Sequence, residues 1–155
     1  MAMMFFGDGQ FPKCGNHMRS RIVGLSKTSR IYSALVECIG DEDLVKLALS
    51  AGTYPRLMVE KLVKGYMVID GIYQGECDRS KLNYIYVHTR VAEGFEDFNH
   101  AYPSYFEKVV LHETVHWGRH LAGLPSEIDG REAGSWFEHL AYKTPYKWHG
   151  DVKCT

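Results

Sequence analysis

Five consecutive residues carry the spacing in this chain that is best suited to metal chemistry. Residues 112–116 read His112-Glu113-Thr114-Val115-His116, an H-E-x-x-H pattern. Residues four apart lie on one face of an α-helix, about one turn from each other, so both imidazoles can reach a single ion while Glu113 lies beside it. This pattern most often marks a catalytic zinc site. The sequence therefore predicts two zinc ligands, His112 and His116, and a general base, Glu113.

The flanking residues predict that this pattern lies inside one helix. Pro103 suits a first helical turn, and apolar residues follow at helical spacing as far as about Leu121. Gly123 and Pro125 then mark the end of the helix. The alternative is an amphipathic core helix whose histidines are four residues apart by accident, but the surrounding helix signals favour a metal site.

A catalytic zinc site usually has a third protein ligand and leaves one position for water. His120 is one candidate, but the helical rise places it about 12 Å along the axis from His112, too far to share one ion unless the helix breaks. The metzincin pattern also fits poorly. Gly118 comes one residue early for it, and His120 comes two residues early.

Two carboxylates on the last predicted helix, about Gly130 to Tyr142, are the other candidates for the third ligand. Glu132 and Glu138 are six positions apart, or about 240° around a helix, so only one of them can face the ion. We favour Glu132, because the small residues Ala133 and Gly134 that follow it would allow a close approach. Glu138 is the alternate third ligand, and otherwise a surface carboxylate or a partner of a ligand.

The order of predicted elements indicates an α+β fold in one domain over residues 1–155. We expect a small β-sheet with the metal-site helices, at 103–142, packed on it. Residues 1–40 look like a loosely structured lead-in. The remaining predicted elements are two helices, at about 41–48 and 55–64, and two strands, at 66–69 and 84–87, paired as a hairpin with a long loop.

Composition excludes several classes of protein. The formal net charge is -1 and 45% of residues are hydrophobic, which argues against disorder and against nucleic acid as a partner. No apolar run is long enough to span a membrane, and we expect no export signal within the chain itself. Four scattered cysteines, with no C-x-x-C pair, leave two disulfides or free thiols equally open: Cys14, Cys38, Cys77 and Cys154.

The H-E-x-x-H pattern with a downstream Glu resembles the gluzincin group of zinc metallopeptidases. That resemblance implies a zincin-like fold, with His112, His116 and Glu132 as ligands and Glu113 as the base. It also implies an edge strand that binds the substrate backbone, for which we expect Tyr84 to Val87. One departure is that Trp136 stands where an E-x-x-x-D string would place Asp, so no residue is assigned as the partner of the ligand histidines.

Residues 111–119 and 132–142 more narrowly resemble the metallopeptidase toxin domains of bacterial polymorphic toxins. The resemblance implies a secreted toxin or effector domain, delivered by a secretion system as part of a larger protein. It also implies a dedicated immunity protein that binds the domain in the producing cell.

The expected reaction is hydrolysis of an amide bond in a protein or peptide substrate. Zinc would activate water and polarise the carbonyl, while Glu113 would take the proton of the water and pass it to the leaving amine. A residue that stabilises the oxyanion is also expected. The candidates are Tyr142, His139, His120 and His149.

Other assignments remain open from the sequence. Arg119 and Arg131 would bind a substrate carboxylate or simply be solvated charges. The substrate could instead be a peptidoglycan cross-link. A non-catalytic alternative is a domain in which zinc is structural and a partner protein is bound, with three tryptophans as anchors: Trp117, Trp136 and Trp148. Glu113 argues against that alternative, because a structural zinc site has no use for a base.

Overall fold

A computed structural model of the chain describes residues 9–52, 54–98 and 103–147. Within them the first 40 residues are not a loose lead-in, which corrects the expectation. They form α1 (Pro12–His17), the π-helical turn η1 (Met18–Ile22) and α2 (Arg30–Ile39). The wider π turn interrupts the 3.6-residue period over residues 12–22. In α2, by contrast, the buried residues follow the helical period, with Ile31, Leu35 and Cys38 among them, so the sequence does carry a signal for this helix.

Side-chain hydrogen bonds cap the N-termini of α2 and α3 (Glu42–Ala48). The Ser29 hydroxyl accepts a hydrogen bond from the amide of Tyr32 at 3.1 Å and starts α2. The Asp41 carboxylate accepts from the amides of Asp43 and Leu44 and starts α3. These caps satisfy amides that have no partner within the helix. The helix predicted from the acidic run at 41–43 is therefore confirmed.

The prediction of a second helix at 55–64 is wrong. This stretch forms β1 (Arg56–Glu60) and β2 (Val63–Lys64). A short apolar run does not distinguish a helix from a strand, and here pairing with a distant segment decides. β1 lies parallel to β5 (Tyr84–His88), with Leu57 opposite Ile85 and both side chains fully buried.

The three-stranded sheet has the order β1-β5-β4, where β4 (Gly71–Tyr73) runs antiparallel to β5. Tyr84 to Val87, which we expected at the edge, therefore lies in the central strand, and β4 forms the edge next to it. The strand predicted at 66–69 corresponds to β3 (Met67–Val68). It pairs with β2 in a separate hairpin rather than with β5.

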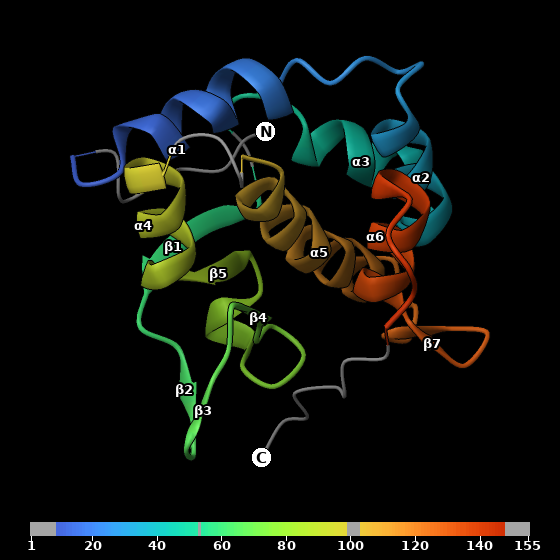
Figure 1. Ribbon diagram of the computed structural model, residues 1–155. Coiled ribbons are helices and arrows are strands. Elements are labelled where there is room, and N and C mark those ends of the chain that lie inside the picture. Colours follow the sequence, from blue (N-terminus) through green and yellow to red (C-terminus); the bar gives the residue numbers. More distant parts are fainter. Residues whose placement is uncertain (1–8, 53, 99–102, 148–155) are drawn as a thin grey trace.

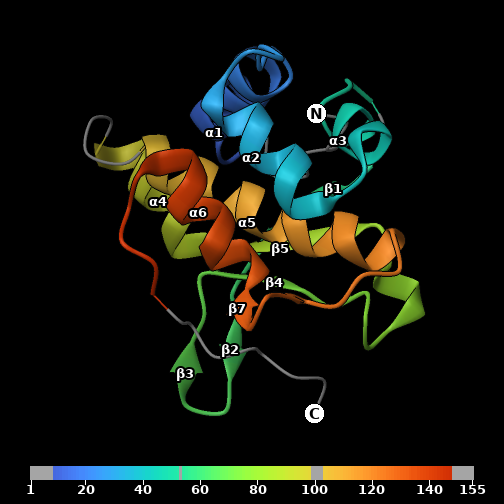
Figure 2. The same cartoon turned by 90° about the vertical axis from the view of Figure 1, so that its right-hand side faces the viewer.

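Helix α5 (Pro103–Leu121) lies between the sheet and the helices α2 and α6 (Ala133–Tyr142) (Figure 1). It packs against β4 and β5 on one side and against α2 and α6 on the other. Figure 2 shows α6 and α2 together over α5. The α+β class is confirmed, and helices are present over both stretches predicted to carry the metal site, with α5 at the predicted bounds.

Smaller elements complete the described chain. They are a 3-10 turn η2 (Arg79–Lys81), α4 (Thr89–Phe98), and the hairpin of β6 (Glu127–Ile128) and β7 (Arg131–Glu132). None of the helices described is long and apolar enough to cross a membrane.

The cysteines are not arranged as two disulfides. Cys14 and Cys38 are free and fully buried, and burial raises the pKa of both thiols. Cys77 is disulfide-bonded. Cys154 lies outside the described residues. The pair of free thiols excludes the two-disulfide alternative.

Candidate metal centre

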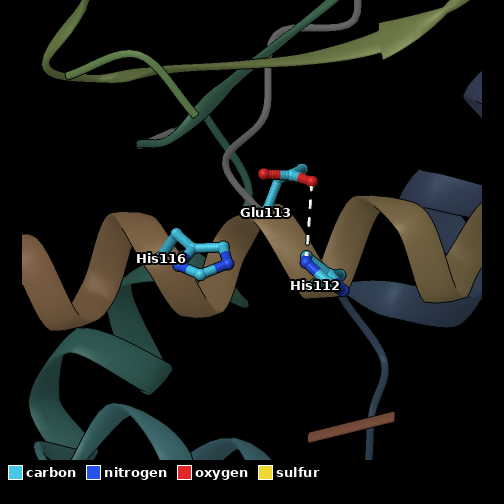
Figure 3. Close-up of side chains that lie close together, drawn as sticks. All are labelled: His112, Glu113 and His116. Carbon is cyan, nitrogen blue, oxygen red and sulfur yellow. Dashed lines mark ion pairs between the residues drawn. The ribbon is translucent and has the colours of Figure 1, made fainter. Parts of the chain in front are cut away.

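The middle of α5 presents the H-E-x-x-H residues together. One potential ligand atom from each of His112, Glu113 and His116 lies within 4.8 Å of the others. In Figure 3 the two imidazoles lie one turn apart, and the Glu113 carboxylate extends from the helix beside His112, at 3.9 Å from its Nε2 atom. The residues next to the two histidines anchor α5, because Leu111 and Trp117 are fully buried. The helical spacing therefore brings the three residues together as the sequence predicts.

Glu132 completes this group from another element. Its Oε1 atom is 3.5 Å from Nε2 of His112 and pairs with Nε2 of His116. Glu132 is the last residue of β7 and the N-cap of α6, whereas we expected it inside the helix. Its carboxylate accepts hydrogen bonds from the amides of Gly134 at 3.0 Å and Ser135 at 2.6 Å. Because the carboxylate satisfies these amides, the helix begins after Glu132.

Gly134 allows α6 to approach the histidines. A Cβ atom on this residue would lie 2.3 Å from Nε2 and Cδ2 of His112, which is less than any van der Waals separation. Only glycine fits against the imidazole at this position. The close approach expected from Ala133 and Gly134 is therefore present, and Gly134 is the residue in contact with His112.

Glu138 contacts the other nitrogen of the same imidazole. Its Oε1 atom lies 2.8 Å from Nδ1 of His112. Its carboxylate therefore lies on the opposite side of the ring from the Nε2 atom that faces Glu132. A carboxylate in this place orients the ring and directs a lone pair of Nε2 outward.

The donor set fits a zinc ion. Zinc–ligand bonds of about 2.0–2.1 Å in a tetrahedral arrangement place neighbouring ligand atoms roughly 3.4 Å apart. The 3.5 Å between His112 Nε2 and Glu132 Oε1 agrees with that spacing, whereas His116 Nε2 contacts the same oxygen directly, so a bound ion would replace that contact. The histidine side chains are 16% and 13% exposed, so an ion can reach them. Two imidazoles and one carboxylate are donors that zinc accepts.

The charges in this site attract a cation. Burial alone would lower the pKa of His112, but the carboxylates of Glu113, Glu138 and Glu132 raise it to about 10. Burial raises the pKa of Glu113, against the opposing influence of both histidines. The pKa of Glu132 is lowered although burial alone would raise it, because His116 and His112 face its carboxylate. Three carboxylates thus surround two imidazoles in a largely buried space.

A Tyr residue that sequence reasoning missed fixes the backbone of Glu132. The Tyr146 hydroxyl oxygen accepts a hydrogen bond from the Glu132 amide at 3.0 Å. Its ring packs edge-on against Trp136, with 6.2 Å between the ring centroids. Tyr146 reaches this place because the chain turns back after α6 at Lys143, which has a left-handed backbone (φ 58°). A single tyrosine in a polar segment carries no pattern that reveals such a contact.

The three oxyanion candidates within the described residues do not gather at the metal site. The Tyr142 hydroxyl donates to Glu107 at 2.6 Å, and His120 lies against the ring of Tyr73. Nδ1 of His139 lies 2.6 Å from the Thr144 carbonyl oxygen. His149 lies outside the described residues.

The structure corrects two of the five arginine and tryptophan assignments, those of Arg119 and Trp117. Arg119 is neither solvated nor available to a substrate, because it is buried and donates to three backbone carbonyls. Arg131 stacks over Trp136, with its guanidinium carbon 4.0 Å from the ring centroid. Trp117 is fully buried and belongs to the core, which excludes it as an interface anchor. Trp148 lies outside the described residues.

The edge strand β4 runs beside the Glu113 carboxylate. A Cβ atom on Gly71 would lie 3.0 Å from Oε1 of Glu113 and 2.8 Å from a methyl group of Val109. The missing side chain of Gly71 therefore lets the strand lie directly against α5. Among the described residues β4 pairs only with β5, so the first residue of this edge strand lies beside Glu113.

Comparison with curated proteins and with solved structures finds no match. The family described as Metallopeptidase toxin 3, in contrast, matches residues 8–143, which include every strand and helix described above. The family match and the cluster of His112, Glu113 and His116 both indicate metal-dependent hydrolysis. The chain therefore belongs to the metallopeptidase toxin 3 family and is a metallopeptidase.

Proposed function

We propose that this metallopeptidase uses zinc, held by His112, His116 and Glu132, and that Glu113 is its general base. The observation that carries the proposal is the convergence of the two Nε2 atoms on one oxygen of Glu132. Glu138 then orients His112 through its Nδ1 atom rather than binding the metal.

A bound zinc ion would supply Lewis acidity, which lowers the pKa of a water molecule and polarises the carbonyl to be attacked. Glu113 accepts the proton of that water and donates it to the leaving amine. Burial suits it to both steps, because it raises the pKa of the Glu113 carboxyl above the ordinary value, which makes the carboxylate a stronger base. The side chain is only 9% exposed, which limits competition from bulk water.

The substrate backbone would lie along the edge strand β4 instead of along Tyr84 to Val87, because that expected edge strand is the central strand β5. Among the described residues β4 pairs only with β5, so its outer edge can receive an extended peptide as an added strand. Gly71 would place that peptide next to Glu113. A protein substrate fits this arrangement, because backbone pairing requires a polypeptide that can adopt an extended conformation.

Membership of a toxin family supports delivery of the domain into another cell. We infer that the chain reaches its target through a secretion system and that the producing cell makes an immunity protein against it. Co-expression of candidate neighbouring genes would test for such a protein, with relief of toxicity as the expected result.

The central experiment compares the unaltered chain with Glu113→Gln. The variant keeps all three proposed ligands, so we expect about one zinc per chain and loss of hydrolysis. Glu37→Gln, which changes an exposed carboxylate on α2, is the matched control and should remain active. Mass spectrometry of peptides released from proteomes and from peptidoglycan identifies the substrate class. Full activity of Glu113→Gln would overturn the proposed mechanism.

A further inference from the structure

The β2–β3 hairpin exposes an unusual amount of apolar surface. Val63, Tyr66, Met67 and Val68 are 61%, 106%, 69% and 44% exposed. These four are half of the large apolar side chains that are exposed among the described residues. In Figures 1 and 2 the hairpin projects below β4, away from α1, α2 and α3. Clustered apolar side chains on a projecting element indicate a binding surface.

The base of the hairpin is firmly attached to the sheet and to the metal-site helix. The Ile69 amide donates to the Leu62 carbonyl at 3.1 Å, which extends the pairing beyond the strands. The next residue, Asp70, accepts hydrogen bonds from Nε of Arg90 at 2.7 Å and from the Tyr105 hydroxyl. Tyr105 belongs to α5, two turns before His112. The hairpin therefore has a defined position relative to the metal centre.

The hairpin also continues directly into the edge strand. Val68 is three residues from Gly71 and Tyr66 is five, so their Cα atoms lie at most about 11 and 18 Å from that of Gly71. An extended substrate gains about 3.3 Å per residue. Substrate residues about three to five positions from the scissile bond therefore come within reach of the exposed side chains.

We propose that the β2–β3 hairpin is a second contact site for the substrate and selects polypeptides with apolar side chains three to five residues from the scissile bond. This inference rests on the proposed function, because it assumes that the substrate pairs with β4. The continuity of the hairpin with β4 favours the substrate as its occupant over an unrelated partner.

Two synthetic peptides test the inference. They share one cleavable core, identified from released peptides, and the longer one adds apolar residues at positions three to five from the scissile bond. For the unaltered chain we expect kcat/KM to be at least about tenfold higher for the long peptide, mostly through a lower KM. Burial of one large apolar side chain is enough to produce a difference of this size. The combined variant Val63→Thr, Tyr66→Ser, Met67→Thr should lower this ratio to about one.

Two further variants control for indirect effects. Leu47→Gln removes an apolar side chain that is 37% exposed on α3, and it should keep the ratio of the unaltered chain. Tyr105→Phe removes the hydroxyl that holds Asp70 without touching the hairpin surface, and it should reduce the ratio partially.

The outcomes separate this inference from the function on which it rests. If the unaltered chain cleaves no peptide in a metal-dependent manner, both are wrong. If it cleaves peptides and the hairpin variant keeps the preference for the long peptide, only the inference is overturned. If the unaltered chain then sediments with phosphatidylglycerol vesicles and the hairpin variant does not, the hairpin binds a membrane instead of the substrate.

Discussion

Glu138 and His112 form a pair across α6 and α5, with 2.8 Å between Oε1 and Nδ1. The two residues are 26 positions apart in the sequence. The contact leaves Nε2 of His112 directed towards Glu132, at 3.5 Å from Oε1. One imidazole is thus held between two carboxylates, each at a different nitrogen, which gives them different roles in the proposed site.

Removal of Glu138 should weaken metal binding without abolishing it. For Glu138→Ala we expect zinc affinity to fall about 10- to 100-fold, because the His112 ring loses the contact that orients it. Glu138→Gln keeps a hydrogen-bond acceptor and should recover part of the loss. Competition against a chelating dye gives the affinities. Unchanged affinity in Glu138→Ala would show that the contact has no influence on the ligand.

Removal of Glu132 should abolish stoichiometric zinc binding. Alanine would also remove the N-cap of α6, at a cost of about 1 kcal/mol in the free energy of unfolding. Glu132→Asp separates the two effects, because Asp caps a helix well but is one methylene too short to reach the histidines. We expect Glu132→Asp to lose zinc in elemental analysis while its thermal unfolding stays near that of the metal-free unaltered chain. One zinc per chain in this variant would exclude Glu132 as a ligand.

A methyl group at position 134 should disturb the metal site more than it disturbs the fold. In Gly134→Ala the new Cβ meets Nε2 of His112 at 2.3 Å, so the ring must move. We expect zinc affinity to fall at least about tenfold. Gly94→Ala in α4 is the matched control, since no atom lies within 4 Å of its new Cβ. It should keep zinc affinity and gain about 0.5–1 kcal/mol in stability. Equal zinc affinity in both variants would contradict the close packing of α6.

The hydroxyl of Tyr146 should matter for the metal, although it is not a ligand. Tyr146→Phe leaves the ring on Trp136 and removes the acceptor of the Glu132 amide, so we expect zinc affinity to fall several-fold. Tyr142→Phe also removes a hydroxyl, but one that donates to Glu107. This control should lower stability and leave zinc affinity unchanged. The same affinity change in both variants would argue for a general loss of stability instead.

Glu107 should make the stability of the protein depend on pH. Burial alone would raise its pKa, but His17, Tyr142 and Arg21 hold it below the ordinary value of 4.5. A carboxyl with a lowered pKa contributes stability that is complete above its ordinary pKa and is lost as the pH falls through the lowered value. We therefore expect the free energy of unfolding to fall below about pH 4.5.

Glu107→Gln tests this dependence. The variant should be about 1–3 kcal/mol less stable at neutral pH, because buried hydrogen bonds to a charged group are lost. Its stability should then decline less between pH 5 and 3 than that of the unaltered chain. Chemical denaturation across this pH range gives both quantities. Parallel pH profiles would show that other carboxylates cause the acid sensitivity.

Local sequence determined the half of the site that lies on one helix. The spacing of His112 and His116 and the apolar period around them depend only on neighbours within a few turns. The helix bounds at Pro103 and Leu121 follow from the same local signals. The small residues after Glu132 also indicated correctly that a second helix approaches closely.

Only the tertiary structure decided the relationships between segments that are distant in sequence. The β6–β7 hairpin and the N-cap at Glu132 place that carboxylate at Nε2, whereas Glu138, six residues later, reaches Nδ1. Residues 56–60 form a strand because they pair with β5. Strand β5 is central because β4 pairs with its other edge. Hydrogen bonds of this kind join residues far apart in the chain, so no local pattern records which partner a strand or a carboxylate will meet.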